Sequence, residues 1–274
     1  RVVIGADSDR ARKIMREIYR PLFLRETPIV FTDLETSELI KYAANSFLAT
    51  KITFINEIAD LCEKVGADVH DVAKGIGLDG RIGSKFLHPG PGYGGSCFPK
   101  DTLALVQTAT QAKAPLRIIE TVVDINQKRK KSMANKIINA CSGDVKNKTI
   151  AILGVTFKPN TDDMRDAPSL DIIPNLQAEG AIINAYDPEG MNEAKVLLND
   201  VLWCDDAYKA MAGADAVAIL TEWNEFRGLD LSRIKALLKS PIVVDLRNIY
   251  NPEEMEDAGF AYFCVGRREI GSHV

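Results

Sequence analysis

The second half of the chain alternates short apolar segments with segments that have the apolar spacing of helices. Residues 149–153, TIAIL, form a continuous apolar run, which is typical of a strand buried on both faces of a parallel sheet. Further strands are expected at residues 181–186, 216–220, 242–245 and 260–265, and helices at residues 208–211, 231–239 and from residue 169. This alternation predicts a doubly wound α/β domain of Rossmann-like form, with ligands at the carboxyl ends of its strands.

The first half of the chain is mainly helical after a short start of strand, helix and strand. Asp7 or Ser8 is suited to cap a first helix that runs to about residue 19. A long helix is predicted over residues 34–65, because apolar residues recur at helical spacing and Gly66 suits its end. The other expected elements are strands at 1–4 and 29–32 and helices at 68–74, from Pro99 to 112, and at 116–141, with Pro115 at position N1 of the last. The fold class is therefore α/β, with an all-helical central domain before the Rossmann-like domain.

Residues 86–101, FLHPGPGYGGSCFPKD, carry the densest cluster of glycines. Four glycines within six positions predict a sharply turning backbone that a ligand can approach closely. Cys97 follows them just ahead of an expected helix N-terminus, where the macrodipole favours a thiolate. Asp101 comes one helical turn later, on the same side as the thiol. A glycine-lined cradle, a poised thiol and a nearby carboxylate indicate covalent catalysis on a bound substrate.

Each of these features has a purely structural alternative. The run GPGYGG at 90–95 fits the pattern G-x-G-x-x-G by letter, but no expected strand precedes it and no βαβ unit contains it. A lone cysteine is most often a small buried apolar residue, so the case for Cys97 depends on the glycines and Asp101. The basic run KRKK at 128–131 could suggest nucleic acid, but in an acidic chain it is interpreted as a solvated helix face.

Composition narrows the class of protein. A hydrophobic content of 46% and a charged content of 26% are typical of a globular protein, and no apolar run is long enough to cross a membrane. A net charge of −4 argues against a nucleic-acid partner. Five scattered cysteines without metal-ligand spacing suit the reducing cytoplasm, and neither they nor the three histidines predict a metal site.

Three segments resemble one enzyme family. RIGSKFLHPGPGYGGSCFPKD at 81–101 is similar to the nucleophile loop of the UDP-glucose/GDP-mannose dehydrogenase family, and its YGGSCFPKD form resembles the UDP-glucose members. KYAANSFLATKITFINE at 41–57 resembles the family's second catalytic segment. GVTFKPNTDDMRDAPS at 154–169 resembles its GxxFKxxTxDxR segment. The resemblance covers essentially all 274 residues, as roughly the last two thirds of the family's chain.

The resemblance implies a four-electron oxidation of UDP-glucose to UDP-glucuronate with NAD as cofactor. It implies that Cys97 forms a thiohemiacetal and then a thioester, that Lys41 and Asn45 donate to oxyanion intermediates, and that Asp101 assists water. It implies that Lys100 and Arg165 contact NAD. The substrate-binding positions that it implies are Lys41, Asn45, Arg81 (across a subunit contact), Phe86, Leu87, His88, Pro89, Gly90, Tyr93, Gly94, Lys158 and Arg247.

The resemblance also implies a division into domains and a homodimer through the helical domain. Residues 1–28 are expected to be the tail of an N-terminal NAD-binding domain that is otherwise absent, 29–142 the helical domain, and 143–274 the UDP-sugar-binding domain. Two alternatives stay open: a catalytically silent fragment that binds nucleotide sugar and dimerises, and a sister enzyme acting on GDP-mannose or UDP-N-acetylmannosamine. The sequence assigns no role to Cys62, Cys141, Cys204 or Cys264 beyond packing.

Overall fold

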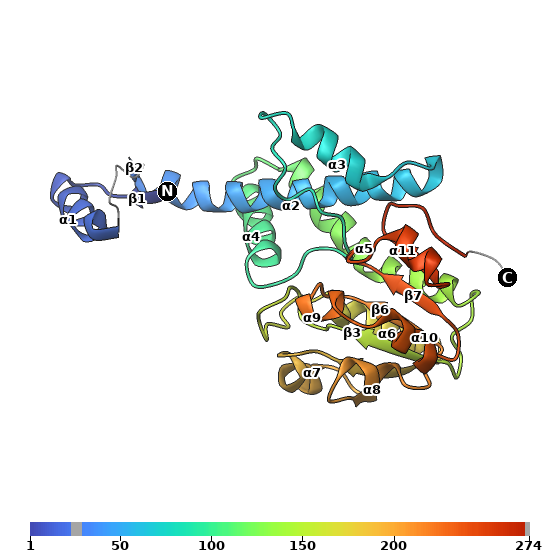
Figure 1. Cartoon of the computed structure of the whole chain (residues 1–274). Coiled ribbons are helices and arrows are strands. Elements are labelled where there is room, and N and C mark those ends of the chain that lie inside the picture. Colours follow the sequence, from blue (N-terminus) through green and yellow to red (C-terminus); the bar gives the residue numbers. More distant parts are fainter. Residues whose placement is uncertain (23–28, 272–274) are drawn as a thin grey trace.

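The computed structural model describes residues 1–22 and 29–271. At its start, β1 (Val2–Gly5) and β2 (Ile29–Thr32) pair in parallel, and α1 (Asp9–Tyr19) and a 3-10 turn, η1 (Arg20–Leu22), lie between them. The hydroxyl of Ser8 accepts from the N–H of Ala11 and caps α1, as the sequence predicts. This unit stands at the amino end of α2, away from the rest of the molecule (Figure 1).

The helical region is built on α2 (Leu34–Val65), which has the predicted bounds. Asp33 caps its start, and Gly66 ends it with a left-handed backbone at φ 74°. The helices α3 (Val69–Gly77), α4 (Phe98–Gln111) and α5 (Arg117–Ala140) pack against it. The expectation that Pro115 occupies position N1 of α5 was wrong, because Leu116 is non-helical (φ −102°, ψ 78°) and the helix begins at Arg117.

The C-terminal region contains a six-stranded sheet in which every strand pair is parallel, in the order β5-β4-β3-β6-β7-β8. Counted within the sheet, this order is 3-2-1-4-5-6, that of the doubly wound Rossmann fold. The strands are β3 (Thr149–Leu153), β4 (Ile182–Tyr186), β5 (Val201–Trp203), β6 (Ala216–Ile219), β7 (Ile242–Asp245) and β8 (Ala261–Cys264). The helices are α6 (Ser169–Ala178), α7 (Met191–Leu197), α8 (Ala207–Met211), α9 (Asn224–Arg227), α10 (Leu231–Leu237) and α11 (Pro252–Asp257). The predicted fold class is confirmed, whereas β5, α7, α9 and α11 were not predicted.

Alternate residues of the central strand β3 enter two different cores. Ile150 and Ile152 of β3 join a cluster with Ile137 of α5 and Ile55 of α2. Ala151 and Leu153 face the other cluster, which includes residues of α8 and α10. From Ile150 to Leu153, β3 is continuously apolar because both of its faces are buried. The helical region and the sheet therefore share one hydrophobic core.

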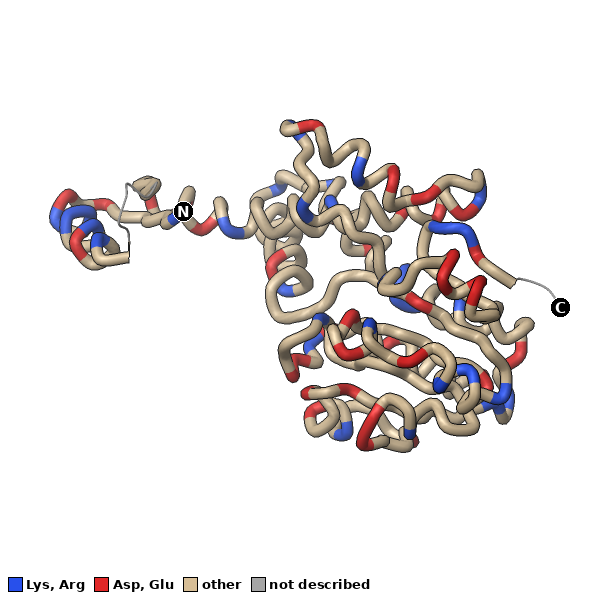
Figure 2. Tube along the Cα trace, in the orientation of Figure 1, with Lys and Arg blue, Asp and Glu red and all other residues tan. Residues whose placement is uncertain are grey.

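The surface carries both signs of charge. Figure 2 shows Lys and Arg intermixed with Asp and Glu over the helical region and the sheet, with a concentration of basic residues along α1. Among the helices of the described chain, none has both the length and the apolarity that crossing a membrane requires.

Three loops at the carboxyl ends of the strands face the helical region. They follow β3, β6 and β7, and they carry Lys158, Glu222 and Arg247 respectively. The strands β3 and β6 are neighbours at the point where the strand order reverses, which is where open α/β sheets bind their ligands. The fold thus places these three side chains opposite α2 and the glycine-rich segment.

Candidate active site

Cys97 lies at the N-cap position of α4, with Pro99 in the first helical turn. Its side chain is exposed, and the Ser96 hydroxyl lies 3.7 Å from its Sγ. The cysteine is therefore not the buried apolar residue of the structural alternative. An exposed thiol at a helix N-terminus is suited to act as a nucleophile.

Asp101 lies one turn along α4 and is fully buried. Its Oδ2 accepts from the Asn45 amide at 2.6 Å and lies 3.0 Å from Lys41 Nζ, while Lys100 Nζ lies 3.1 Å from Oδ1. Burial alone would raise the pKa of Asp101, but the hydrogen bonds from Lys41, Lys100 and Asn45 outweigh it and lower the pKa. This carboxyl group is therefore ionised at neutral pH.

Lys41 and Asn45 lie one turn apart on α2 and point toward the same carboxylate. The pKa of Lys41 is raised, chiefly by its hydrogen bond to Asp101 and in part by the nearby Cys97 sulfur. An ammonium group has three hydrogens and an amide group two, so each retains a donor beyond the one aimed at Asp101. The structure thus brings Cys97, Asp101, Lys41 and Asn45 together, and these donors can stabilise an oxyanion beside the thiol.

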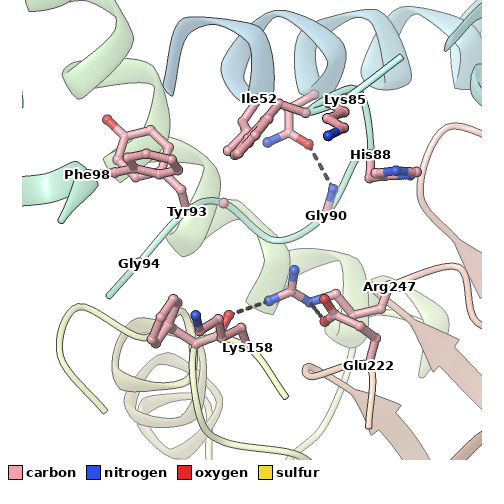
Figure 3. Close-up of a pocket in the computed structure, with 14 residues that line it drawn as sticks. Ile52, Lys85, His88, Gly90, Tyr93, Gly94, Phe98, Lys158, Glu222 and Arg247 are labelled. Atoms are coloured by element: carbon pink, nitrogen blue, oxygen red, sulfur yellow. Dashed lines mark hydrogen bonds and ion pairs between the residues drawn. The ribbon is translucent and has the colours of Figure 1, made fainter. Parts of the chain in front are cut away.

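A cavity of about 450 Å³ opens between α2, the glycine-rich segment and the carboxyl ends of the strands (Figure 3). Seven of the predicted substrate-binding residues line it: Phe86, His88, Gly90, Tyr93, Gly94, Lys158 and Arg247. Seven further lining residues were not predicted: Ile52, Asn56, Lys85, Gly92, Phe98, Phe157 and Glu222. The cavity combines aromatic surface with several cations, as a nucleotide site requires.

Five of the twelve predicted substrate-binding residues do not line this cavity. Two of them, Lys41 and Asn45, point toward Asp101 instead. Leu87 is buried in the hydrophobic core, and Pro89 is also buried. Arg81 lies in an exposed loop, where its guanidinium pairs with Asp79 at 2.6 Å. Its predicted contact crosses a subunit boundary, so it stays a prediction.

The glycines of the segment are required by close packing. A Cβ atom on Gly94 would collide with the carbonyl oxygen of Asp166, and one on Gly95 would lie 2.6 Å from the Phe157 ring. The Asn126 side chain accepts from the N–H of Tyr93 at 2.9 Å and donates to its carbonyl at 3.1 Å. Side chains and neighbouring loops thus satisfy backbone groups that have no strand or helix to pair with.

Arg247 is held at the cavity by its surroundings. The buried carboxylate of Asp245 accepts from the Arg247 N–H at 3.0 Å and from the Tyr262 hydroxyl at 2.8 Å, which shapes the turn after β7. Burial raises the pKa of Asp245, and these hydrogen bonds oppose the rise. The Arg247 guanidinium donates to the carbonyls of Leu220 and Phe157 and lies 3.1 Å from Glu222 (Figure 3).

Lys100 and Arg165, the predicted cofactor contacts, are exposed cations close to the thiol. The pKa of Arg165 is raised, first by its hydrogen bond to Asp163 and to a smaller degree by the Cys97 sulfur. Lys100 is three residues from Cys97 and pairs with Asp101. Exposed cations on this side fit an anionic cofactor such as a dinucleotide. Across the described residues, no group of His, Cys, Asp and Glu is placed to hold a metal ion.

Comparisons with known proteins match both regions to one family. Residues 35–128 match the central domain of the UDP-glucose/GDP-mannose dehydrogenase family, and residues 151–252 match the UDP binding domain of the same family. The chain belongs to the UDP-glucose/GDP-mannose dehydrogenase family. The family resemblance that the three sequence segments indicate is therefore confirmed.

Named family members are similar along nearly the whole chain. A UDP-glucose 6-dehydrogenase of Rhizobium meliloti is 60% identical over 97% of this chain and 62% of its own length. One from Bacillus subtilis is 50% identical over 98% of this chain and 58% of its own length. The solved structure of a UDP-glucose dehydrogenase from Pyrobaculum islandicum matches with a TM-score of 0.85 at 32% identity, covering 97% of this chain and 58% of that one. The chain thus spans about three fifths of the length of these family members.

The basic run KRKK at 128–131 is only partly exposed, although the sequence predicted a solvated helix face. Lys128 and Lys131 are exposed, but Arg129 and Lys130 are buried. The expectation of a single solvated face was wrong for the inner pair. Arg129 and Lys130 lie on the side of α5 that packs against the glycine-rich segment and the loop after β3.

Proposed function

We propose that this chain carries the substrate site and the nucleophile of an NAD-dependent UDP-glucose 6-dehydrogenase, which oxidises UDP-glucose to UDP-glucuronate. The observation that carries the proposal is the exposed Cys97 thiol beside Lys41, Asn45 and Asp101. Two relatives at 60% and 50% identity, both named UDP-glucose 6-dehydrogenase, support the choice of sugar.

The cavity is the proposed site of the nucleotide sugar. Lys158 and Arg247 lie on its sheet side and provide cations for a pyrophosphate (Figure 3). Phe86, Tyr93 and Phe98 provide apolar surface, and their rings pack edge to face with centroids 6.0 Å apart. Phe98 lines the cavity and directly follows Cys97, so the sugar end of the bound ligand is proposed to lie toward the N-terminus of α4.

Cys97 is the proposed nucleophile. Oxidation of the primary alcohol of the sugar gives an aldehyde, and the thiolate of Cys97 adds to its carbon, so that the carbonyl oxygen becomes an oxyanion. Lys41 and Asn45 donate to that oxygen. Oxidation of this thiohemiacetal gives a thioester, and attack by water then breaks the C–S bond and releases the carboxylate and the thiolate.

Asp101 is the proposed base for the water. Its lowered pKa keeps it ionised at neutral pH, so its carboxylate is available to accept a hydrogen bond from the attacking water and orient it. Two molecules of NAD would each accept one of the two hydrides that the oxidation of an alcohol to an acid releases. Lys100 and Arg165 are the residues of this chain proposed to contact NAD.

The direct test is product analysis with the full-length protein. With UDP-glucose and NAD we expect NADH absorbance at two NADH per UDP-glucuronate formed. Equal or faster turnover of GDP-mannose or UDP-N-acetylmannosamine would assign a sister activity instead. The same assay with residues 1–274 alone tests the silent-fragment alternative. That alternative predicts that UDP-glucose binds and that no NADH is formed.

We also propose that two copies associate through α2. Phe47, Phe54 and Leu61 are 65%, 47% and 55% exposed, and their spacing of seven residues aligns them along one side of the helix. Exposed apolar stripes of this kind mark contact surfaces. Such a contact would also give Arg81 a neighbouring subunit to reach.

Replacing Phe54 by glutamate is expected to convert the dimer to monomer, because it puts a charge in the middle of the stripe. Sedimentation velocity of the full chain measures this, with at least a tenfold weaker association expected. Ile182→Glu is the matched control, since Ile182 is similarly exposed at 52% but lies in the sheet. A Phe54→Glu protein that remains dimeric at micromolar concentration would show that the copies meet elsewhere.

A further inference from the structure

The basic run at 128–131 consists of an exposed outer pair and a buried inner pair on the same helix. Arg129 is 5% exposed and Lys130 is 1% exposed, whereas Lys128 and Lys131 are open to solvent. The proposed chemistry uses none of these four residues. The contacts of the inner pair show a different kind of role.

Arg129 holds the carbonyl group of Gly90, a residue that lines the cavity. Its Nε donates to that oxygen at 2.6 Å, and its Nη1 donates to the Asp60 carboxylate at 2.8 Å. The Asn56 side chain accepts from the N–H of Gly90 at 2.8 Å. Side chains from α5 and α2 therefore fix both backbone polar groups of Gly90.

Lys130 holds the other side of the same segment. Its ammonium donates to the carbonyl of Asp166 at 2.9 Å. That carbonyl occupies the space where a Cβ on Gly94 would lie, and the neighbouring Arg165 carbonyl accepts from the N–H of Gly95 at 2.7 Å. Lys130 thus fixes the surface against which the chain packs just before Cys97.

A contribution to stability alone is a poor explanation for a buried ammonium. Burial lowers the pKa of Lys130, and the carboxylate of Asp171, 3.9 Å away, opposes the shift. A well-packed apolar residue of similar volume is often as stabilising at such a site, or more so. Lys130 nevertheless donates to the main-chain oxygen that packs against Gly94, three residues before Cys97, which indicates that geometry is what it provides.

We propose that Arg129 and Lys130 are positioning residues that hold the glycine-rich segment, so that the cavity and Cys97 act on one bound nucleotide sugar. This inference rests on the proposed function. It predicts that removing either cation weakens UDP-glucose binding without preventing folding, since Asp60 is largely exposed and Lys130 leaves no buried carboxylate behind.

The test compares inner with outer residues of the run in the full-length protein. Arg129→Met and Lys130→Met remove the two buried donors, and Lys128→Met and Lys131→Met are matched controls on the same helix. Calorimetric titration gives the Kd for UDP-glucose, and thermal unfolding is measured separately. We expect about a tenfold rise in Kd or more for each inner variant, and less than about a twofold change for each outer one.

The remaining outcomes separate this inference from the function on which it rests. Partial recovery of binding in Arg129→Lys, which keeps a cationic donor, would support positioning. Inner and outer variants with the same Kd, whatever their melting temperatures, would overturn the inference and leave the proposed function standing. An unsubstituted protein that binds no UDP-glucose would overturn both.

Discussion

A Cys97→Ser variant of the full-length protein is expected to bind UDP-glucose normally and to form almost no UDP-glucuronate. We expect acid formation to fall by at least about 10³-fold, because loss of an activated nucleophile costs that much or more. The serine hydroxyl is not ionised at neutral pH and is therefore a much weaker nucleophile than a thiolate. Any acyl intermediate would be an oxygen ester in place of the thioester. The Kd for UDP-glucose should change by less than about twofold, because Cys97 does not line the cavity.

The control for this variant is Cys204→Ser. Cys204 is also a free and partly exposed cysteine, but it follows β5 at the far edge of the sheet. It should retain full activity and binding. Wild-type turnover by Cys97→Ser would exclude the covalent route, whatever the behaviour of Cys204→Ser.

An Asp101→Asn variant is expected to lose about 10²-fold or more in kcat, the contribution of a positioned general base. Stability should fall by about 1–3 kcal/mol, since a buried carboxylate loses its charge-assisted hydrogen bonds. The loss stays moderate because Lys41 and Lys100 are exposed and are not left as buried charges. Steady-state kinetics and urea unfolding at pH 7 measure the two effects.

The same variant has a defined pH signature. The pKa of Asp101 is lowered from its usual 3.8 in the folded state, so its contribution to stability is complete above about pH 4 and declines as pH falls through the lowered value. The gap in unfolding free energy between the unsubstituted protein and Asp101→Asn should therefore close in acid. Asp124→Asn, which alters an exposed pair with Lys128, should change stability by less than about 1 kcal/mol at either pH. A gap that persists below the lowered pKa would show that packing, and not charge, explains the loss.

The elements that sequence predicted best are those with strong local signals. The bounds of α2 follow from its apolar stripe and from Gly66 at its end. The buried strand β3 follows from its unbroken apolar run. By contrast, β5 has only three residues at the edge of the sheet, and an apolar run of that length does not distinguish a strand from other short apolar segments.

The site residues that lie within a recognisable sequence motif could be predicted. The residues that only three-dimensional packing brings to the cavity could not. Cys97, Lys41 and Asn45 were found through segments of contiguous sequence. Glu222 and Asn56 line the cavity from separate loops and helices, and each looks like an ordinary surface residue in the sequence. The buried state of Lys130 depends on where the segment around Gly94 packs, which helical periodicity alone does not determine.

The shared core of α2, α5 and β3 has a consequence for how this chain denatures. Ile55, Ile137 and Ile152 belong to one apolar cluster, so separating the helices from the sheet would expose all of them to water. The two family-defined regions should then melt in a single cooperative transition and not as independent modules. A truncation at the family boundaries would leave each half with an exposed apolar surface. Each half would therefore aggregate more readily than the joined chain.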